Sequence, residues 1–191
     1  CRMVIVVTFL CLPSLSQGVL LNNPGFEFGD TTDWTTSGGP ATLSASTTVA
    51  HIGSYSGKTS NRTEMWQGPC RDLIGLFESG NTYHFSCWVR MATVNDTAYL
   101  TVCKQDDSNG GLQTYTTIGS VFATTSGWAE ITGSYTYTPT GTVSKLIVYA
   151  QPGGTTTDFY FEDLYIFCTP NNGDFESGDT SNWNTSGCTL N

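Results

Sequence analysis

The sequence predicts an all-β fold, specifically a jelly-roll β-sandwich of two antiparallel sheets. Three observations support this prediction. Only 12% of the residues are charged and 13% are aromatic, and Ser, Thr and Gly are abundant, which favours strands over helices. Residues 83–91 alternate strictly, so that one face would carry Tyr83, Phe85, Cys87, Val89 and Met91. Turn-forming Gly, Pro and Asn residues separate short apolar runs, as in sandwiches and jelly rolls.

The expected strands follow one another along about 150 residues, the length of a typical single domain. Besides residues 83–91, strands are expected over residues 98–104, 113–122, 129–137, 145–149 and 159–167. Turn signals lie between them at residues 95–96, 106–111, 125–127, 139–141 and 152–154. Only residues 72–79 have an apolar spacing suited to a helix, and this segment is brief.

The N-terminal segment predicts a secretory signal peptide over residues 1–18. Arg2 precedes an apolar run over residues 3–12, and Ser16 and Gly18 supply the small residues of a cleavage site after Gly18. The run is shorter than the about 20 residues that a transmembrane helix needs. A buried N-terminal strand is the alternative interpretation. We expect a secreted, extracellular protein without membrane insertion.

An internal repeat indicates where the first domain ends. Residues 22–34 read NNPGFEFGDTTDW and residues 171–183 read NNGDFESGDTSNW, 149 positions later (171 minus 22). Thr-Ser-Gly follows each tryptophan after one intervening residue. Because chance does not readily produce this agreement at fixed spacing, one module is expected over residues 19–168, and residues 169–191 begin a second, similar module.

Cysteine usage fits an oxidising compartment. Two of the seven cysteines, Cys1 and Cys11, lie in the expected signal peptide, so five remain. None of these is in a Cys-x-x-Cys pair, which gives no support for zinc, and disulfides are expected instead. Cys87 and Cys103 are expected on neighbouring strands of one hairpin but on opposite faces, so the pairing stays open. Three glycosylation sequons also fit secretion; they begin at Asn61, Asn95 and Asn184.

The charge of the chain argues against two classes of partner. The formal net charge is −9, and the sequence has no basic cluster. Nucleic acids and anionic membranes require such a cluster for electrostatic binding, so neither is an expected partner.

Several segments, in the same order along the module, resemble the family 22 and family 4/9 carbohydrate-binding modules attached to xylanases and related glycoside hydrolases. They are residues 23–27 (NPGFE) with Trp34, residues 51–56 (HIGSYS) with 61–69 (NRTEMWQGP), residues 80–90 and residues 159–166 (FYFEDLYI). The resemblance implies a jelly roll that binds xylan or a related β-1,4-glycan. It also implies a glycoside hydrolase domain elsewhere in the full-length protein, which the module would hold against its substrate. The alternative is an extracellular adhesion or structural sandwich without a sugar cleft.

The expected binding residues are aromatic and polar side chains, because aromatic rings cover the apolar faces of sugars and polar groups bind the hydroxyls. Trp66 lies in a polar segment bounded by Gly and Pro, where an exposed indole is costly without a ligand. The resemblance adds Arg62, Tyr115, Tyr149 and Gln151. For Trp66 and the two tyrosines, ordinary packing aromatics are the alternative. Family 22 xylan binders usually have Glu where this chain has Gln151, which predicts weaker binding or a shifted preference.

The other tryptophans are interpreted as structural or left unassigned. Trp34 and Trp128 each follow a turn signal and are expected to pack, and Trp88 is not assigned to binding.

The resemblance further implies a structural calcium ion, with Glu27, Glu162 and Asp163 as its ligands. Carboxylate oxygens suit this hard cation, and two adjacent carboxylates inside an apolar strand need a compensating partner. The alternatives are a solvated Glu and an Asp that caps a turn.

Catalysis by this module is not expected. A glycosidase needs two carboxylates at a defined separation, and the acidic residues show no such arrangement. The sequence contains no Gly-x-Ser-x-Gly motif, and its two histidines, His51 and His84, form no metal motif. Any hydrolase activity of the full-length protein would belong to a domain outside this sequence.

Overall fold

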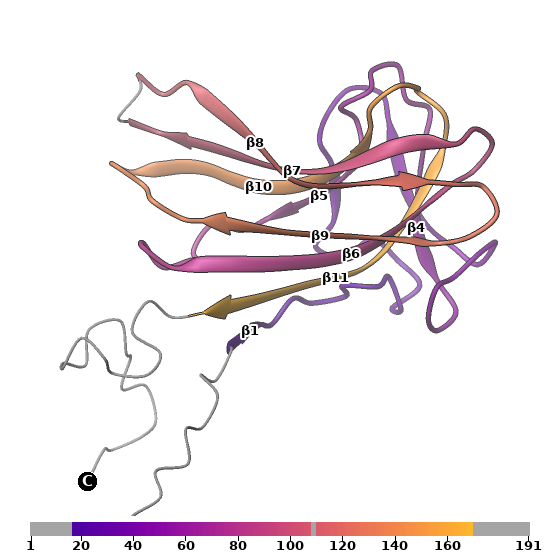
Figure 1. Cartoon of the computed structure of the whole chain (residues 1–191), viewed down its shortest axis with the longest axis horizontal. Helices are drawn as coiled ribbons and strands as arrows, with labels where there is room; N and C mark the ends of the chain where they lie inside the picture. Colours follow the sequence, from indigo (N-terminus) through magenta and orange to yellow (C-terminus); the bar gives the residue numbers. More distant parts are fainter. Residues whose placement is uncertain (1–16, 108–109, 170–191) are drawn as a thin grey trace, which may run out of the picture.

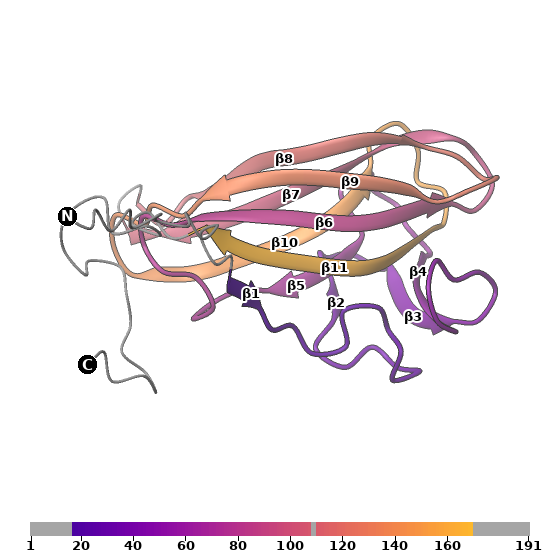
Figure 2. The same cartoon turned by 60° about the horizontal axis from the view of Figure 1, so that its bottom comes forward.

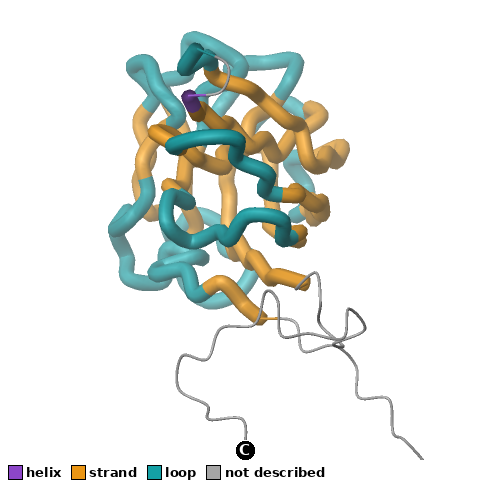
Figure 3. The backbone as a smooth tube through the Cα atoms, turned by 90° about the vertical axis from the view of Figure 1, so that its left-hand side faces the viewer, coloured by secondary structure: helices purple, strands orange, loops and turns teal. Residues whose placement is uncertain are grey.

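The computed structural model describes residues 17–107 and 110–169 and confirms the predicted fold class. Within these residues, eleven β-strands form two sheets in which every recorded pairing is antiparallel, and the sheets lie face to face as a sandwich (Figure 1). The regular structure is almost entirely strand (Figure 3). None of the described residues forms an α-helix, so the brief helical spacing at residues 72–79 was misleading; turns occupy half of that segment.

Sheet A has six strands. Five follow the order β3 (Thr42–Ser46), β4 (Ser56–Ser60), β11 (Phe159–Thr169), β6 (Thr82–Met91) and β9 (Ala129–Thr136). The sixth, β1 (Gln17–Val19), pairs with the end of β11, so the two strands lie side by side (Figure 2).

Sheet B has five strands. Their order is β2 (Thr35–Thr36), β5 (Pro69–Asp72), β10 (Val143–Pro152), β7 (Asp96–Asp106) and β8 (Gln113–Ala123). Strand β10 is the centre of this sheet, with β5 on one side and β7 on the other.

The core lies between the sheets and is built by alternation. Along β6 the residues predicted to share a face are buried, all at 2% exposure or less. On the facing sheet, β10 contributes Leu146, Val148 and Ala150. Because each strand gives every second side chain to this core, the opposite face of each sheet is available for other contacts.

Strand β11 keeps its apolar residues in the core by means of a β-bulge. The pairing with β6 shifts between Glu162 and Tyr165, and Asp163 adopts a φ of 54°. The extra residue reverses the alternation, so Phe161 before the bulge and Leu164 after it are both buried. The two adjacent carboxylates, Glu162 and Asp163, therefore lie at the bulge, where the regular alternation of the strand is interrupted.

At the β8–β9 edge the two sheets approach closely enough to require glycine. A Cβ atom on Gly133 would lie 1.9 Å from the carbonyl oxygen of Ile118, and one on Gly119 would lie 2.3 Å from that of Thr132. Both atoms belong to the backbone of the other sheet, so no side-chain movement could relieve the contact.

The six expected strands match β6 to β11 to within three residues at either end, whereas β1 to β5 were not among the expected strands. The predicted hairpin with Cys87 and Cys103 on neighbouring strands was wrong, because β6 and β7 belong to different sheets. Cys87 is in the core, whereas Cys103 packs with Cys70 beneath Tyr149. The four cysteines within the described residues, Cys70, Cys87, Cys103 and Cys168, are buried free thiols, in contrast to the expected disulfides.

The remaining organisational predictions concern residues that lie mainly outside the described part. These are the signal peptide, of which only Gln17 and Gly18 are described, as part of β1, and the second module, of which only Thr169 is described. Within the described residues, no helix has the length and apolar character required to cross a membrane.

Candidate functional site

The outer face of sheet B carries a cleft whose floor is strand β10. The residues of β10 that do not enter the core, Lys145, Ile147, Tyr149 and Gln151, follow one another at intervals of two and point to this face. Cross-strand pairing aligns them with β7 and β8: Ile147 lies opposite Cys103, which lies opposite Tyr115. The sheet therefore fixes one row of side chains along the cleft and other rows across it.

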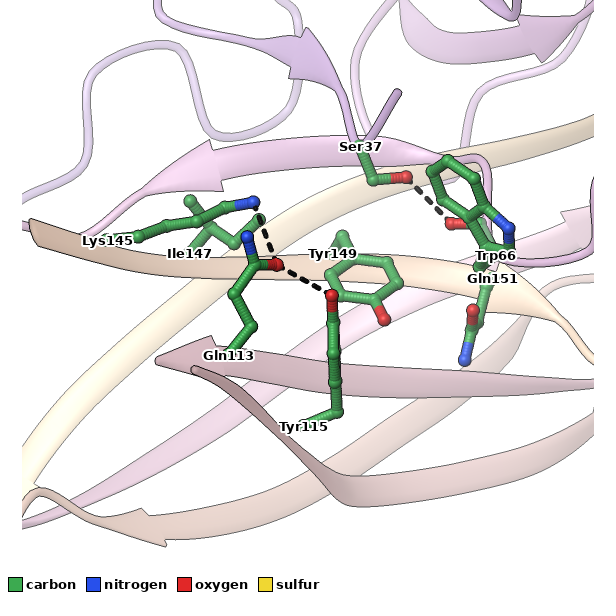
Figure 4. A pocket seen from close by; sticks show the side chains of 8 residues that line it. All are labelled: Ser37, Trp66, Gln113, Tyr115, Lys145, Ile147, Tyr149 and Gln151. Atoms are coloured by element: carbon green, nitrogen blue, oxygen red, sulfur yellow. Dashed lines mark hydrogen bonds between the residues drawn. The ribbon is translucent and has the colours of Figure 1, made fainter. Parts of the chain in front are cut away.

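The cleft encloses about 450 Å³ and is lined by side chains from four parts of the chain. Its lining residues are Ser37, Trp66, Gln113, Tyr115, Lys145, Ile147, Tyr149 and Gln151. In Figure 4, Trp66 and Tyr115 stand on either side of Tyr149, while Lys145 and Gln151 lie toward opposite ends. A volume of this size fits a small ligand or a few units of a polymer.

Trp66 projects from a loop that is anchored by buried polar side chains. The indole is 44% exposed, although the next residue, Gln67, is only 1% exposed. The amide oxygen of Gln67 accepts hydrogen bonds from the backbone N–H groups of Thr63 (2.7 Å) and Glu64 (3.2 Å). These bonds close residues 63–67 into a compact loop that presents Trp66 at the cleft.

Arg62 anchors the same loop from below and does not line the cleft. Its guanidinium donates to the carbonyl oxygens of Gln67 (2.6 Å), Met65 (2.5 Å), Thr157 (2.7 Å) and Thr155 (3.2 Å). The residue is 6% exposed, and burial lowers the pKa of Arg62 to about 10. In this arrangement Arg62 is a positioning residue for Trp66, in contrast to the expected contact with a ligand.

Ser37 and Gly38 fix the opposite side of the Trp66 loop. The Ser37 hydroxyl donates to the carbonyl of Trp66 at 2.7 Å and accepts the N–H of Gly68 at 2.9 Å. A Cβ atom on Gly38, whose φ is 148°, would lie 2.8 Å from the Trp66 ring. One edge of the indole thus lies against a position where a Cβ atom would clash.

The two tyrosines differ in exposure and therefore in what they offer a ligand. Tyr115 is 62% exposed, and its hydroxyl donates to Gln113 Oε1 at 2.6 Å. Tyr149 is only 6% exposed and packs on Cys70 and Cys103, and burial raises its pKa to about 12. Tyr149 forms the floor of the cleft, while Tyr115 and Trp66 offer ring surface to solvent.

The polar lining groups are placed at the ends of the cleft. Gln151 is half-buried, and its amide nitrogen approaches the Thr101 hydroxyl at 3.5 Å. At the other end, Lys145 Nζ lies 3.4 Å from Gln113 Oε1. Amide, hydroxyl and ammonium groups can all bind sugar hydroxyls, so both ends can orient a polar ligand.

Four of the five predicted binding residues meet in this one cleft: Trp66, Tyr115, Tyr149 and Gln151. Sequence reasoning missed Ser37, Gln113, Lys145 and Ile147. Extending the alternation of β10 backwards from Tyr149 would have found Ile147 and Lys145, and one step back from Tyr115 would have found Gln113. No sequence signal links Ser37 to the cleft.

The other tryptophans pack, as expected for Trp34 and Trp128, whereas Trp88 had no assigned role. Trp34 is 5% exposed and stacks on Phe26 with ring centres 5.0 Å apart. Trp88 and Trp128 both contact His51, at centroid distances of 3.9 Å and 6.0 Å.

The three predicted calcium ligands all contact one loop, residues 51–55. The Glu162 carboxylate accepts the backbone N–H groups of His51 (2.5 Å) and Ile52 (3.0 Å), while Asp163 faces His51 Nδ1 at 3.3 Å. Glu27 accepts the N–H groups of Ser54 (3.1 Å) and Tyr55 (2.9 Å). Burial raises the pKa of Glu162, and the neighbouring charge of Asp163 adds to the shift.

The donor chemistry of these carboxylates suits a hard cation, since Glu162 is 0% and Asp163 is 7% exposed, and among the described residues the basic side chain recorded beside them is the imidazole of His51, 3.3 Å from Asp163. As the side chains lie, however, no group of three acidic, His or Cys residues in the described part of the chain converges on a point that could hold a metal ion. The calcium ion stays a prediction.

A cleft with exposed aromatic rings, a flat sheet floor and polar groups at its ends is suited to binding carbohydrate. Sandwich and cleft together define the class of β-sandwich domains that bind glycans on the face of one sheet.

Comparison with known proteins identifies the family. The model of a carbohydrate binding domain family matches residues 18–157. The chain therefore belongs to this family. It is 31% identical over 167 residues to exoglucanase XynX of Acetivibrio thermocellus, and 29% identical over 184 residues to endo-1,4-beta-xylanase A of Thermoanaerobacterium saccharolyticum. These matches cover 85% and 90% of the chain but only 15% and 16% of the two relatives.

Solved structures agree with this assignment. The family 22 carbohydrate binding module at the C-terminus of Clostridium thermocellum Xyn10B superposes with a TM-score of 0.67 at 28% identity, covering 76% of this chain and 91% of that one. The chain is thus a carbohydrate-binding domain with the sandwich expected from its sequence.

Proposed function

We propose that the cleft on sheet B binds a xylan-type β-1,4-linked glycan and that the domain targets a secreted glycoside hydrolase to this polymer. The observation that carries the proposal is the pair of exposed rings, Trp66 and Tyr115, above the floor formed by Tyr149. The matched relatives include an endo-1,4-beta-xylanase, which acts on a polymer of this class. The cleft favours this function over an adhesion domain without a sugar site.

The hydrolase and the secretion are further parts of the proposal. The chain spans about 15% of the length of its curated relatives, so a catalytic domain would belong to the remainder of a longer protein. The repeat at residues 171–183 supports a second binding module in tandem, which would raise avidity through a high effective concentration. The apolar segment at residues 3–12 supports export.

Calcium is proposed as a structural ion near Glu162 and Asp163. Support comes from the burial of two adjacent carboxylates beside a single histidine, because such a pair repels itself unless a cation compensates it. Glu27, at the far end of the same loop, is the third proposed ligand.

Replacement of Trp66 by alanine tests the binding proposal. Trp66 exposes 44% of its surface, or roughly 110 Å² of an aromatic side chain of roughly 250 Å². If a sugar covers one of the two ring faces, about 55 Å² at about 25 cal/mol/Å² gives about 1.4 kcal/mol, a tenfold loss of affinity. Isothermal titration with linear xylo-oligosaccharides measures this loss.

The matched control is Tyr165→Ala, which removes an exposed ring (55%) from sheet A. This variant should bind within twofold of the wild type. Equal affinities of wild type and Trp66→Ala would remove Trp66 from the site. Absence of binding by the folded wild type to xylan and to cellulose would refute the proposed function.

A further inference from the structure

Lys145 differs from every other cationic side chain in the described part of the chain. Lys58, Arg71 and Lys104 lie within 4 Å of a carboxylate, at 3.0, 3.5 and 2.7 Å. Arg62 and Arg90 donate to backbone carbonyl oxygens. Lys145 has neither kind of partner within the described residues; its contact is the amide oxygen of Gln113 at 3.4 Å. Within the described residues, no carboxylate therefore forms an ion pair with this ammonium group.

The position of Lys145 places that charge inside the cleft. It is the one charged residue among the eight that line the cleft, and it lies at the opposite end from Trp66 and Gln151 (Figure 4). Tyr149 follows it four positions later on β10, or about 13 Å along the strand. A group bound at Lys145 would thus lie beside, and not between, the aromatic rings.

Unused hydrogen-bond donors gather at this end. The Lys145 ammonium has three N–H groups, of which one approaches Gln113 Oε1. The Gln113 oxygen also accepts from the Tyr115 hydroxyl, while the Gln113 amide nitrogen has no acceptor within the described residues. Two kinds of donor and one positive charge therefore face solvent together, a combination that suits a carboxylate.

The acidic residue that the pairing of β5 with β10 places on the same face of the sheet is Asp72. Asp72 lies opposite Ile147 on β5, and it faces the same side of the sheet. Its carboxylate accepts the backbone N–H of Ile74 at 2.9 Å, which holds it at the turn that follows β5. Lys145 and Asp72 form no ion pair.

We propose that Lys145 and Gln113 bind the carboxylate of a uronic acid that branches from the glycan chain in the cleft, so that the domain prefers acidic over neutral xylan. This inference rests on the proposed xylan-type ligand and adds the identity of its substituent. The net charge of −9 would otherwise repel an acidic polymer, so the contact has to be local and charge-assisted. A charge-assisted contact at a half-exposed site is expected to raise affinity about three- to tenfold.

Calorimetric titration of the protein with two xylo-oligosaccharides of equal length tests this inference, one neutral and one with a single glucuronic acid branch. The wild type should bind the acidic oligosaccharide about three- to tenfold more tightly at low salt, and less so at 0.5 M salt. Lys145→Gln should abolish the difference, so that this variant binds the two oligosaccharides with equal affinity. Lys145→Arg should restore it. Lys58→Gln, with the same change of net charge on sheet A, should leave it intact.

Equal binding of both oligosaccharides by the wild type, or a preference that survives in Lys145→Gln, overturns the inference while the proposed function stands. Binding of neither overturns both. A third titration, with polygalacturonate, tests whether the site recognises a uronic acid in a branch or in the backbone of a polymer. Tighter binding of polygalacturonate than of the acidic xylo-oligosaccharide would overturn the assignment to a branch.

Discussion

Replacement of Arg62 by lysine separates a positioning role from ligand contact, because it keeps the charge and removes the planar fork. The guanidinium donates to four carbonyl oxygens, three of them at 2.7 Å or less. A lysine ammonium has three donors on a flexible stem and cannot match four carbonyls arranged around a plane. If two bonds are lost, at about 1.5 kcal/mol for each bond to a charged group, the free energy of unfolding falls by about 3 kcal/mol.

For a chain of this size, a loss of 3 kcal/mol lowers the melting temperature by about 6–12 °C. Urea unfolding followed by tryptophan fluorescence measures the free energy. Arg90→Lys is the matched control, since Arg90 makes one bond, to the carbonyl of Thr125 at 2.9 Å, and should lose less than about 1 kcal/mol. Our reasoning would be refuted if Arg62→Lys unfolded like the wild type but bound glycan more than tenfold more weakly, because Arg62 would then contact the ligand.

Three further predictions follow from the core, the cleft floor and the acidic loop. Gly133→Ala should lower the free energy of unfolding by at least about 2 kcal/mol, because its Cβ would lie 1.9 Å from a backbone oxygen. The control, Gly127→Ala, has open space around it and should change this free energy by no more than about 0.5 kcal/mol. Similar urea midpoints for the two variants would contradict the close approach of the sheets. Burial raises the pKa of Tyr149 to about 12, above the value near 10 of an unfolded tyrosine, so its contribution to stability is complete below pH 10 and is lost as the pH rises toward 12. The urea midpoint should thus fall less between pH 9 and 11 in Tyr149→Phe than in the wild type. If the midpoints of the two proteins fell equally with pH, ionisation of Tyr149 would be excluded as the cause. Removal of calcium by EDTA should lower the melting temperature, and re-addition of calcium but not of magnesium should restore it; an unchanged melting temperature would refute the proposed ion.

The fold could be predicted because alternation is a local property of the chain. The buried residues of β6 share one face, as the alternation of apolar residues along the strand predicts. Which strands share a sheet is set by long-range pairing instead, and for this reason the hairpin with Cys87 and Cys103 was wrong. Similarly, the β-bulge at Asp163 changes which residues of β11 are buried, and strict alternation along the strand does not predict it.

The cleft was predictable in part for the same reason. Tyr149 and Gln151 share a face by spacing, and the family resemblance pointed to Trp66 and Tyr115. The role of Arg62 was not predictable, because the carbonyls that it binds at Thr155 and Thr157 lie more than 90 residues along the chain. Sequence reasoning identified the neighbourhood of Arg62 correctly and the direction of its side chain incorrectly.

The pairing of β1 with β11 has a mechanical consequence. Gln17 lies opposite Cys168, so the chain enters and leaves the sandwich at adjacent points of sheet A, on strands that run in opposite directions. Tension between the flanking segments would therefore break the backbone hydrogen bonds between β1 and β11 one after another and not all at once. The β1–β11 pairing would therefore separate at low force and lengthen the segment that precedes the domain. The binding cleft on sheet B would stay folded meanwhile.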